Sequence, residues 1–251
     1  MPDFDSGGVR IHYVLNGPED GRPIVLVHGF ASAFELNWVG SRWRQTLSDA
    51  GFRVIGVDCR GHGHSDKPHD IGVYTRAHLA GDVLRLLDHL GLDRADYLGY
   101  SMGGQVGVEV ARAHGDRLGR IVLGGVGRSS LRSGPGGAER IARRLRGDES
   151  VTDPKARMFY EFAIARPIND LEALACCILG LTRFDIEGID AIASPVLVVT
   201  GGADEMAEGV DELVAAIPGA RHVGVEGRNH MNVLPARQFK EAALRFLQAS
   251  G

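Results

Sequence analysis

The chain has few cysteines, and their pattern excludes two classes of protein. Its 251 residues include three cysteines, Cys59, Cys176 and Cys177. An odd number without metal-ligand spacing indicates neither a disulfide framework nor a zinc site. We therefore expect reduced thiols and no metal, as is typical of a cytoplasmic protein.

Strong charge and long apolar runs are also missing. The formal net charge of -4 gives no electrostatic reason to expect nucleic acid or an anionic membrane as a partner. No apolar run approaches the ~18 residues of a membrane-spanning helix. The first ten residues, MPDFDSGGVR, are acidic and lack the apolar core of a secretory signal. We expect no membrane association.

What is present is an alternation of apolar runs and helical stretches. Apolar runs that end in glycine or turn residues predict strands buried on both faces, as in a parallel sheet. The pattern predicts an α/β fold with a mostly parallel, doubly wound sheet. Such strands are expected at 23–29, 53–58, 95–101, 120–127 and 195–202. The alternating run 9–17 predicts a half-exposed strand near a sheet edge, and 221–227 is a further, shorter strand candidate; helices are expected at 35–50, 76–91, 103–115, 207–216 and 235–249.

Residues 128–190 break this alternation, because they contain no convincing strand. SSLRSGPGG (129–137) is typical of a flexible connection, and helical pieces follow near 138–147, 154–165 and 170–182. We interpret 128–190 as a helical lid inserted into one α/β core, which is formed by 1–127 and 191–251. Within it, the basic run RIARRLRGDE (140–149) is either an anion-docking patch or, as we favour, a solvated helix face with Ile141 and Leu145 turned inward.

One serine lies among glycines where a strand and a helix meet. YLGYSMGGQVG (97–107) places Ser101 directly after an apolar strand and before a good helix. Gly-x-Ser-x-Gly is a weak motif in a glycine-rich chain, but this position is that of a nucleophile held in a sharp strand-to-helix turn. Ser101 would also lie beyond the carboxyl end of a strand, where open α/β sheets bind ligands.

A serine nucleophile needs a base and an acid that orients the base. His230 follows the last predicted strand, whereas His222 lies within that strand and is the weaker candidate. Asp204 follows the strand that ends near Thr200, with Glu205 as its competitor. The resulting order, Ser101, Asp204, His230, is the order expected for this type of fold.

The attack of serine on a carbonyl also needs donors for the oxyanion. These are usually the N–H of the residue after the nucleophile and one from the loop after an earlier strand. Met102 and Phe30 hold these positions, and we expect His28 to brace the loop rather than to take part in the chemistry.

Taken together, these segments resemble the α/β-hydrolase superfamily, in its lid-bearing serine hydrolase branch. The resemblance rests on HGF (28–30), DCRGHGHSD (58–66), GYSMGG (99–104), GGADE (201–205) and NH (229–230), and it covers most of the chain outside 128–190. It implies that the acidic and basic side chains of 58–66 brace the structure.

The resemblance also fails in two informative places. Haloalkane dehalogenases and epoxide hydrolases of this superfamily carry an aspartate where Ser101 stands, which disfavours their chemistry. Some relatives place the acid after the preceding strand, but GGVGR (124–128) has no carboxylate. This departure favours Asp204.

The sequence therefore predicts a serine hydrolase of a small carboxylic ester, lactone or thioester, with no cofactor. Trp38, Phe159 and Phe162 are candidates for an apolar substrate pocket, although core packing explains them equally well. Two alternatives stay open. The same triad hydrolyses carbon–carbon bonds or supports perhydrolysis in some relatives, and other relatives are ligand receptors with slow turnover.

Overall fold

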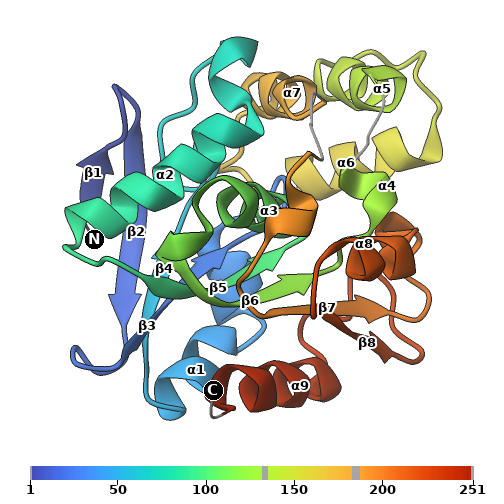
Figure 1. Cartoon of the computed structure of the whole chain (residues 1–251). Coiled ribbons are helices and arrows are strands. Elements are labelled where there is room, and N and C mark those ends of the chain that lie inside the picture. Colours follow the sequence, from blue (N-terminus) through green and yellow to red (C-terminus); the bar gives the residue numbers. More distant parts are fainter. Residues whose placement is uncertain (1, 132–134, 183–186, 250–251) are drawn as a thin grey trace.

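The structure is a computed structural model that describes residues 2–131, 135–182 and 187–249 (Figure 1). Eight strands form one sheet in the order β1-β2-β4-β3-β5-β6-β7-β8. Their bounds are β1 (Asp3–Asp5), β2 (Arg10–Asn16), β3 (Arg22–Val27), β4 (Phe52–Val57), β5 (Ala95–Tyr100), β6 (Leu118–Gly124), β7 (Val196–Gly201) and β8 (Arg221–Val225).

The sheet is mostly parallel, as the sequence predicted. From β4 across to β8 every neighbouring pair is parallel, and only β1 and β2 join antiparallel. The inner strand β5 is buried along its whole length, including Asp96, whose carboxylate pairs with Arg22. All seven predicted strands are present. β1 was not predicted, because three residues are too few for a periodic pattern.

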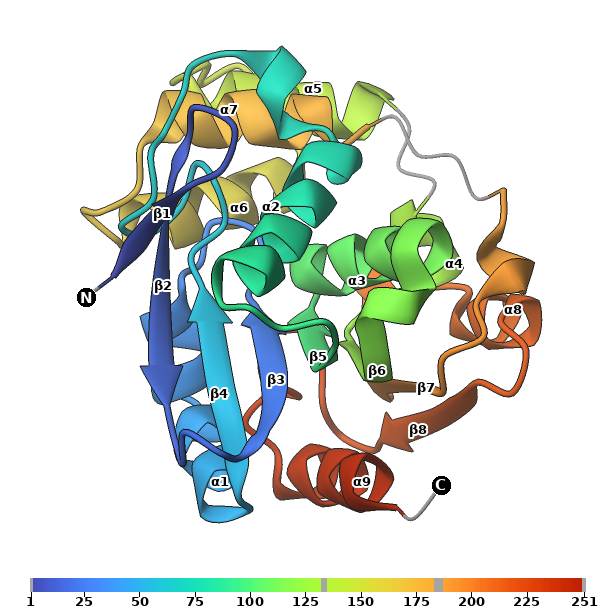
Figure 2. The same ribbon diagram turned by 60° about the vertical axis from the view of Figure 1, so that its left-hand side comes forward.

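Helices cover both faces of the sheet. Figures 1 and 2 show α1 and α9 on one face and α2, α3 and α8 on the other, and a separate apolar core fills the space on each face. The helices are α1 (Trp43–Asp49), α2 (Arg76–His89), α3 (Met102–His114), α4 (Arg128–Leu131), α5 (Pro135–Leu145), α6 (Pro154–Ile164), α7 (Leu171–Gly180), α8 (Val210–Ala216) and α9 (Arg237–Gln248).

The prediction of one continuous helix over 35–50 was wrong. A π-helical turn spans Glu35–Val39, Arg42 has a left-handed φ of 65°, and α1 begins only at Trp43. A regular helix would turn Trp38 and Trp43 about 140° apart, since each residue rotates it by about 100°. The break allows both indoles to enter the same core, where both are fully buried.

Residues 128–190 contain no strand in the part that the structure describes. They form α4 to α7 between β6 and β7, and Figure 2 shows β3 and β4 pointing toward the side where α5, α6 and α7 lie. α4 was not expected, because the sequence reads there as a flexible connection; residues 132–134 of that connection lie outside the described residues. That the segment acts as a lid stays a prediction.

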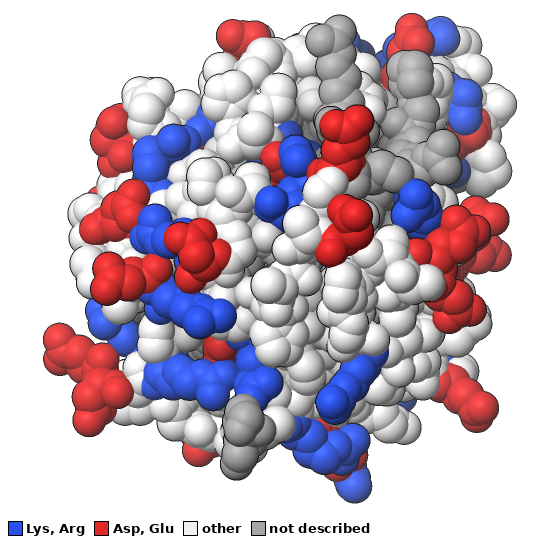
Figure 3. Space-filling model, in the orientation of Figure 1, with Lys and Arg blue, Asp and Glu red and all other residues white. Residues whose placement is uncertain are grey.

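The basic run on α5 forms ion pairs within the chain. Ile141 and Leu145 are buried, as predicted. The arginines on the outer side pair as Arg140 with Asp153, Arg143 with Asp148 and Arg146 with Glu172. Acidic and basic side chains are also interspersed over the face in Figure 3. These ion pairs favour the solvated helix face over an anion-docking patch.

Candidate active site

Ser101 lies in a strained turn between β5 and α3. Its backbone has φ 53° and ψ -112°, a region that residues with a Cβ rarely occupy. The Ser101 N–H donates to the carbonyl of Gly124 on the neighbouring strand, at 2.8 Å. The turn therefore presents the serine side chain beyond the end of the sheet, as predicted for a nucleophile elbow.

Two of the flanking glycines are required by close backbone approach. A Cβ on Gly99 would overlap the carbonyl oxygen of Gly103, and a Cβ on Gly103 would overlap the carbonyl oxygen of Val27. Strand β5, helix α3 and strand β3 therefore pack with no room for a side chain at either position. The glycines serve the geometry of this turn rather than a flexible loop.

The structure brings Ser101 and His230 together across 129 residues of sequence. Nε2 of His230 lies 3.0 Å from Oγ of Ser101, a hydrogen-bonding distance. His230 follows β8, and Ser101 follows β5, so the two side chains meet because both strands end at the same edge of the parallel sheet. The His230 side chain is 11% exposed.

Asp204 completes the row of side chains. Nδ1 of His230 lies 3.0 Å from both Oδ1 and Oδ2 of Asp204, whose side chain is fully buried. The Met206 N–H donates to Oδ1 at 3.0 Å, which fixes the carboxylate in the turn after β7. A carboxylate on Nδ1 stabilises the tautomer in which Nε2 accepts a proton from serine.

The alternative candidates for the acid and the base, Glu205 and His222, have other surroundings. Glu205 begins the short 3-10 turn after Asp204 and lines a cavity beside Ser101 rather than contacting His230. His222 lies within β8, where Nε2 is 2.8 Å from Oγ1 of Thr200. The geometry supports Asp204 and His230 as the partners of Ser101.

Two residues that sequence reasoning missed support the histidine. Oη of Tyr100 donates to the backbone carbonyl of His230, and the two rings lie 5.3 Å apart. A Cβ on Gly125, which has φ +63°, would lie 2.9 Å from Cε1 of His230. Only the position of Tyr100, directly before the serine, could have drawn attention to it.

The loop after β3 lies beside the serine. Among the described residues, neither the Phe30 N–H nor the Met102 N–H has a hydrogen-bond partner, and both residues line a cavity with Ser101. Unpaired, pre-positioned N–H groups are what an oxyanion requires. Phe30 and Met102 thus have the properties predicted for the two donors.

The same loop is held on three sides. His28 is fully buried, its Nε2 accepts from the Cys59 N–H at 3.0 Å, and burial lowers the pKa of its imidazole. Oδ1 of Asn37 accepts from the Gly29 N–H at 2.8 Å. Nδ2 of Asn169 donates to the carbonyls of Ala31 at 3.2 Å and Ala163 at 3.0 Å. His28 therefore braces the loop, and Asn169 joins it to α6, a contact without sequence signal.

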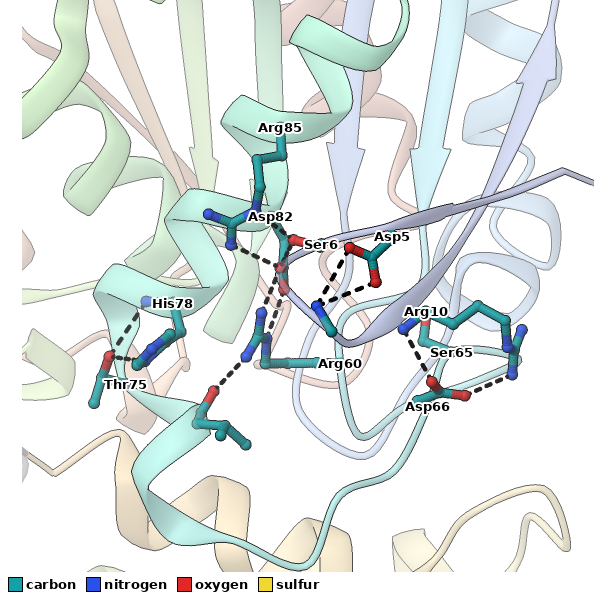
Figure 4. Close-up of polar contacts among 12 residues, drawn as sticks. Asp5, Ser6, Arg10, Arg60, Ser65, Asp66, Thr75, His78, Asp82 and Arg85 are labelled. Atoms are coloured by element: carbon teal, nitrogen blue, oxygen red, sulfur yellow. Dashed lines mark hydrogen bonds and ion pairs between the residues drawn. The ribbon is translucent and has the colours of Figure 1, made fainter.

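The acidic and basic side chains of 58–66 form structural contacts. Arg60 makes two bonds to the buried carboxylate of Asp82, at 2.6 and 2.8 Å (Figure 4). Asp58 accepts from the backbone N–H of Phe34 and His64, and Ser65 Oγ donates to the Asp58 carbonyl at 2.6 Å. These bonds agree with the bracing role that the resemblance implied.

Two cavities meet at Ser101. The first, here called the Met102 cavity, is about 460 Å³ and is lined by Met102, Gln105 and Arg76 among others. The second, the His230 cavity, is about 640 Å³ and includes His230, Tyr100 and Leu234. Phe30 and Phe159 line both, and their rings meet edge to face at 5.5 Å.

The predicted pocket residues divide between cavity and core. Phe159 lines both cavities, and Phe162 lines the His230 cavity. The expectation for Trp38 was wrong: its indole is fully buried in the core beneath the sheet and lines neither cavity. Proximity in sequence to the loop after β3 misled the prediction, because the π-helical turn directs this side chain into the core.

The three cysteines are buried within the described part of the chain. Cys59, Cys176 and Cys177 are buried free cysteines, and burial raises the pKa of each thiol, which keeps them protonated. Over 2–131, 135–182 and 187–249, no three side chains of histidine, cysteine, aspartate or glutamate are grouped so as to hold a metal ion.

Comparisons with known proteins identify the fold family. A family profile described as the alpha/beta hydrolase fold matches residues 22–146. An enol-lactonase from Burkholderia xenovorans LB400 superposes with a TM-score of 0.83 at 29% identity, over 99% of this chain and 100% of that one. The chain belongs to the α/β-hydrolase superfamily.

Other members of the superfamily are similar over the whole chain or over part of it. A hydrolase from Pseudomonas aeruginosa PA01 has a TM-score of 0.83 at 27% identity, covering 99% of this chain and 98% of its own. A haloalkane dehalogenase from Mycolicibacterium paratuberculosis is 36% identical over 121 residues, 47% of this chain. That match spans only 38% of the dehalogenase.

Among the described residues, none of the helices combines the length of a membrane span with sufficient apolar character.

Proposed function

We propose that this α/β hydrolase is a serine hydrolase that cleaves a carboxylic ester, or a lactone or thioester, through an acyl-enzyme. The observation that carries the proposal is the row of three side chains: Ser101 Oγ at 3.0 Å from Nε2 of His230, and His230 Nδ1 at 3.0 Å from the carboxylate of Asp204. Such a row activates a hydroxyl that is otherwise a poor nucleophile.

Acylation uses each of these groups once. Nε2 of His230 takes the proton as Ser101 Oγ attacks the substrate carbonyl carbon, and Asp204 stabilises the imidazolium that forms. The carbonyl oxygen becomes an oxyanion, for which the N–H groups of Phe30 and Met102 are the available donors. His230 then returns the proton to the leaving oxygen or sulfur, the bond to the carbonyl carbon breaks, and the acyl group stays on Ser101.

Deacylation repeats the same steps with water. His230 takes a proton from a water molecule, whose oxygen attacks the acyl carbon. The tetrahedral intermediate collapses, Ser101 Oγ regains the proton from His230, and the carboxylic acid leaves. The strained backbone of Ser101 keeps the hydroxyl in place for both halves of the reaction.

The nucleophile also separates this proposal from the chemistry of some relatives. Haloalkane dehalogenases and epoxide hydrolases are among the similar proteins. In the resemblance described above those enzymes carry aspartate at the position of Ser101, so their alkyl-enzyme route is not the one proposed here. The likeness to an enol-lactonase makes lactones a substrate class to assay beside open-chain esters.

The domain boundaries are part of the proposal. We assign 1–127 and 191–251 to the hydrolase core and 128–190 to a lid. Support comes from the side chains that the segment adds to the site, since Phe159 lines both cavities and Phe162 the larger one. Replacing 132–186 by a short linker is expected to leave the sheet folded and to change the preferred length of the ester, measured on an aryl ester series. An insoluble product would argue that the segment belongs to the core.

The experiment that tests the activity combines labelling and turnover. A fluorophosphonate probe is expected to label the protein covalently, and aryl esters and lactones are expected to be hydrolysed over many turnovers. Ser101→Ala should lose the label and nearly all turnover while keeping the thermal transition of the parent. Labelling that persists in Ser101→Ala would refute the assignment. Tight ligand binding with almost no turnover would favour a receptor.

A further inference from the structure

Arg166 carries a positive charge to the wall of the His230 cavity. It follows α6 and lines this cavity together with Ser101 and His230. Much of the remaining wall is apolar and includes Phe159 and Phe162 on α6 as well as Leu234. A guanidinium beside such side chains is only partly solvated. Its charge is therefore screened less and attracts anions inside the cavity more strongly than it would in water.

Arg166 forms no ion pair with any described carboxylate, as is also true of Arg144 and Arg157 on the helical segment. By contrast, Arg140 and Arg143 on α5 and Arg146 directly after it each lie within 3.1 Å of an aspartate or glutamate oxygen. The acidic residue that lines this cavity, Glu161, is exposed and makes no ion pair with Arg166 among the described residues. Burial lowers the pKa of Arg166, and no carboxylate opposes that effect.

The guanidinium is held in place but its hydrogen-bonding capacity is incompletely used. Its plane lies over the Phe162 ring, with the central carbon 3.7 Å from the ring centroid. Nη1 donates to the carbonyl of Phe162. Nε is buried and has no partner among the described residues. Nη2 also has no partner among the described residues, and it is the nitrogen that remains for a ligand oxygen, because Nε is closed to solvent.

We propose that the His230 cavity is built for a substrate that carries an anionic group, a carboxylate in the first instance, and that Arg166 binds this group. The inference rests on the serine hydrolase proposed above and adds the class of its substrate. The two oxygens of a carboxylate match the planar fork of N–H donors on a guanidinium. The attraction between the two charges is also stronger in a partly desolvated site than in water. The ester bond would then lie at Ser101 and the anion farther along the cavity.

The competing explanation is structural. An arginine near the end of a helix often bonds the last carbonyls, and the contact with Phe162 is of this kind. A purely structural arginine affects neutral and anionic substrates alike, whereas an anion-binding arginine discriminates between them. The test therefore depends on matched substrates.

The kinetic experiment uses two pairs of esters that differ in charge but little in size. The pairs are 4-acetoxybenzoate with 4-acetoxybenzamide, and 4-nitrophenyl hydrogen glutarate with 4-nitrophenyl pentanoate, so that the anion lies once on the alcohol and once on the acyl side. In the parent protein at least one anion should have a KM about tenfold or more below that of its neutral partner, as expected for one charge-assisted hydrogen bond. Arg166→Gln should abolish this preference, and Arg166→Lys should restore part of it.

Arg157→Gln is the matched control, because Arg157 is exposed on α6, the helix that Arg166 follows, and lines neither cavity. It removes the same charge and should leave the preference intact. Loss of preference in both variants would indicate a long-range field effect and overturn the proposal. So would an equal loss for charged and neutral esters in Arg166→Gln, or no preference in the parent.

A binding measurement separates this inference from the proposed function. Calorimetric titration of Ser101→Ala with 4-acetoxybenzoate should show binding that weakens about tenfold or more in the double variant with Arg166→Gln, whatever the rate of turnover. If esters are not hydrolysed but this binding and its loss are seen, the serine hydrolase fails and the anion site stands. If esters are hydrolysed without charge discrimination and the titration is flat, the anion site fails alone.

Discussion

Both carboxylate oxygens of Asp204 lie 3.0 Å from Nδ1 of His230, and the next residue along the chain, Glu205, turns into the Met102 cavity instead. Neighbouring residues of an extended turn point in different directions, so only one of the two acids faces the imidazole. Oδ1 of Asp204 also accepts a hydrogen bond from the Met206 N–H, which orients the carboxylate independently of His230.

Exchanging each acid for its amide tests this choice. Asp204→Asn should lower kcat by about three to four orders of magnitude, by analogy with the aspartate of a serine-protease triad, and should leave the fold intact. Glu205→Gln should cost less than about tenfold, as a change beside the site. Steady-state kinetics on an aryl ester measure both. A larger loss of kcat in Glu205→Gln than in Asp204→Asn would assign the role of the acid to Glu205.

The sharp turn at Ser101 predicts a large cost for one added methyl group. In Gly103→Ala the new Cβ overlaps the carbonyl oxygen of Val27, so strand β3 and helix α3 must separate. We expect at least about 2 kcal/mol off the free energy of unfolding, measured in urea, together with loss of activity. Gly115→Ala is the control, because nothing lies within 4 Å of its Cβ. Equal stability of the two variants would contradict the packing argument.

Asn169 is expected to act through the loop that carries Phe30. Asn169→Ala removes the bonds to the carbonyls of Ala31 and Ala163. A loosened loop would weaken stabilisation of the oxyanion, so kcat should fall about tenfold, which corresponds to roughly one hydrogen bond, with KM nearly unchanged. Ile168→Ala, an exposed neighbour, should keep the parent kcat. A lower melting temperature with an unchanged kcat would mean that Asn169 contributes to stability but does not position the loop that carries Phe30.

His62 should make the protein sensitive to acid. Burial, with a smaller effect of His28, lowers the pKa of His62 from 6.5 to about 3. Between these values the unfolded chain binds more protons than the folded one, so stability falls as the pH falls below about 6.5. Down to pH 5 the loss from this group is about 2 kcal/mol, since each pH unit is worth about 1.4 kcal/mol.

The variant His62→Gln should flatten that dependence. Urea unfolding at pH 7 and pH 5 should show a smaller difference in stability than in the parent, even if the variant is less stable at both. His114→Gln, at an exposed position, should keep the dependence of the parent. A slope unchanged in His62→Gln would assign the acid sensitivity to other groups.

Much of the fold is determined locally, and the sequence predicts that part well. The strands β3 to β7 are mostly apolar runs between turn residues, because most of their positions are buried on both faces of the sheet. The glycines around Ser101 mark the turn for the same local reason, since close backbone approach excludes a side chain there. The chain order Ser101, Asp204, His230 follows from which residues stand at the ends of strands.

Only the tertiary structure decided which neighbouring side chain faces the site and which enters the core. Trp38 stands near the oxyanion loop in sequence, but a π-helical turn sends it beneath the sheet. Asn169 and Arg166 carry no motif, yet the packing of α6 brings one onto the Ala31 carbonyl and the other to the wall of the His230 cavity. The direction of a side chain depends on backbone dihedrals and long-range contacts that no periodicity records.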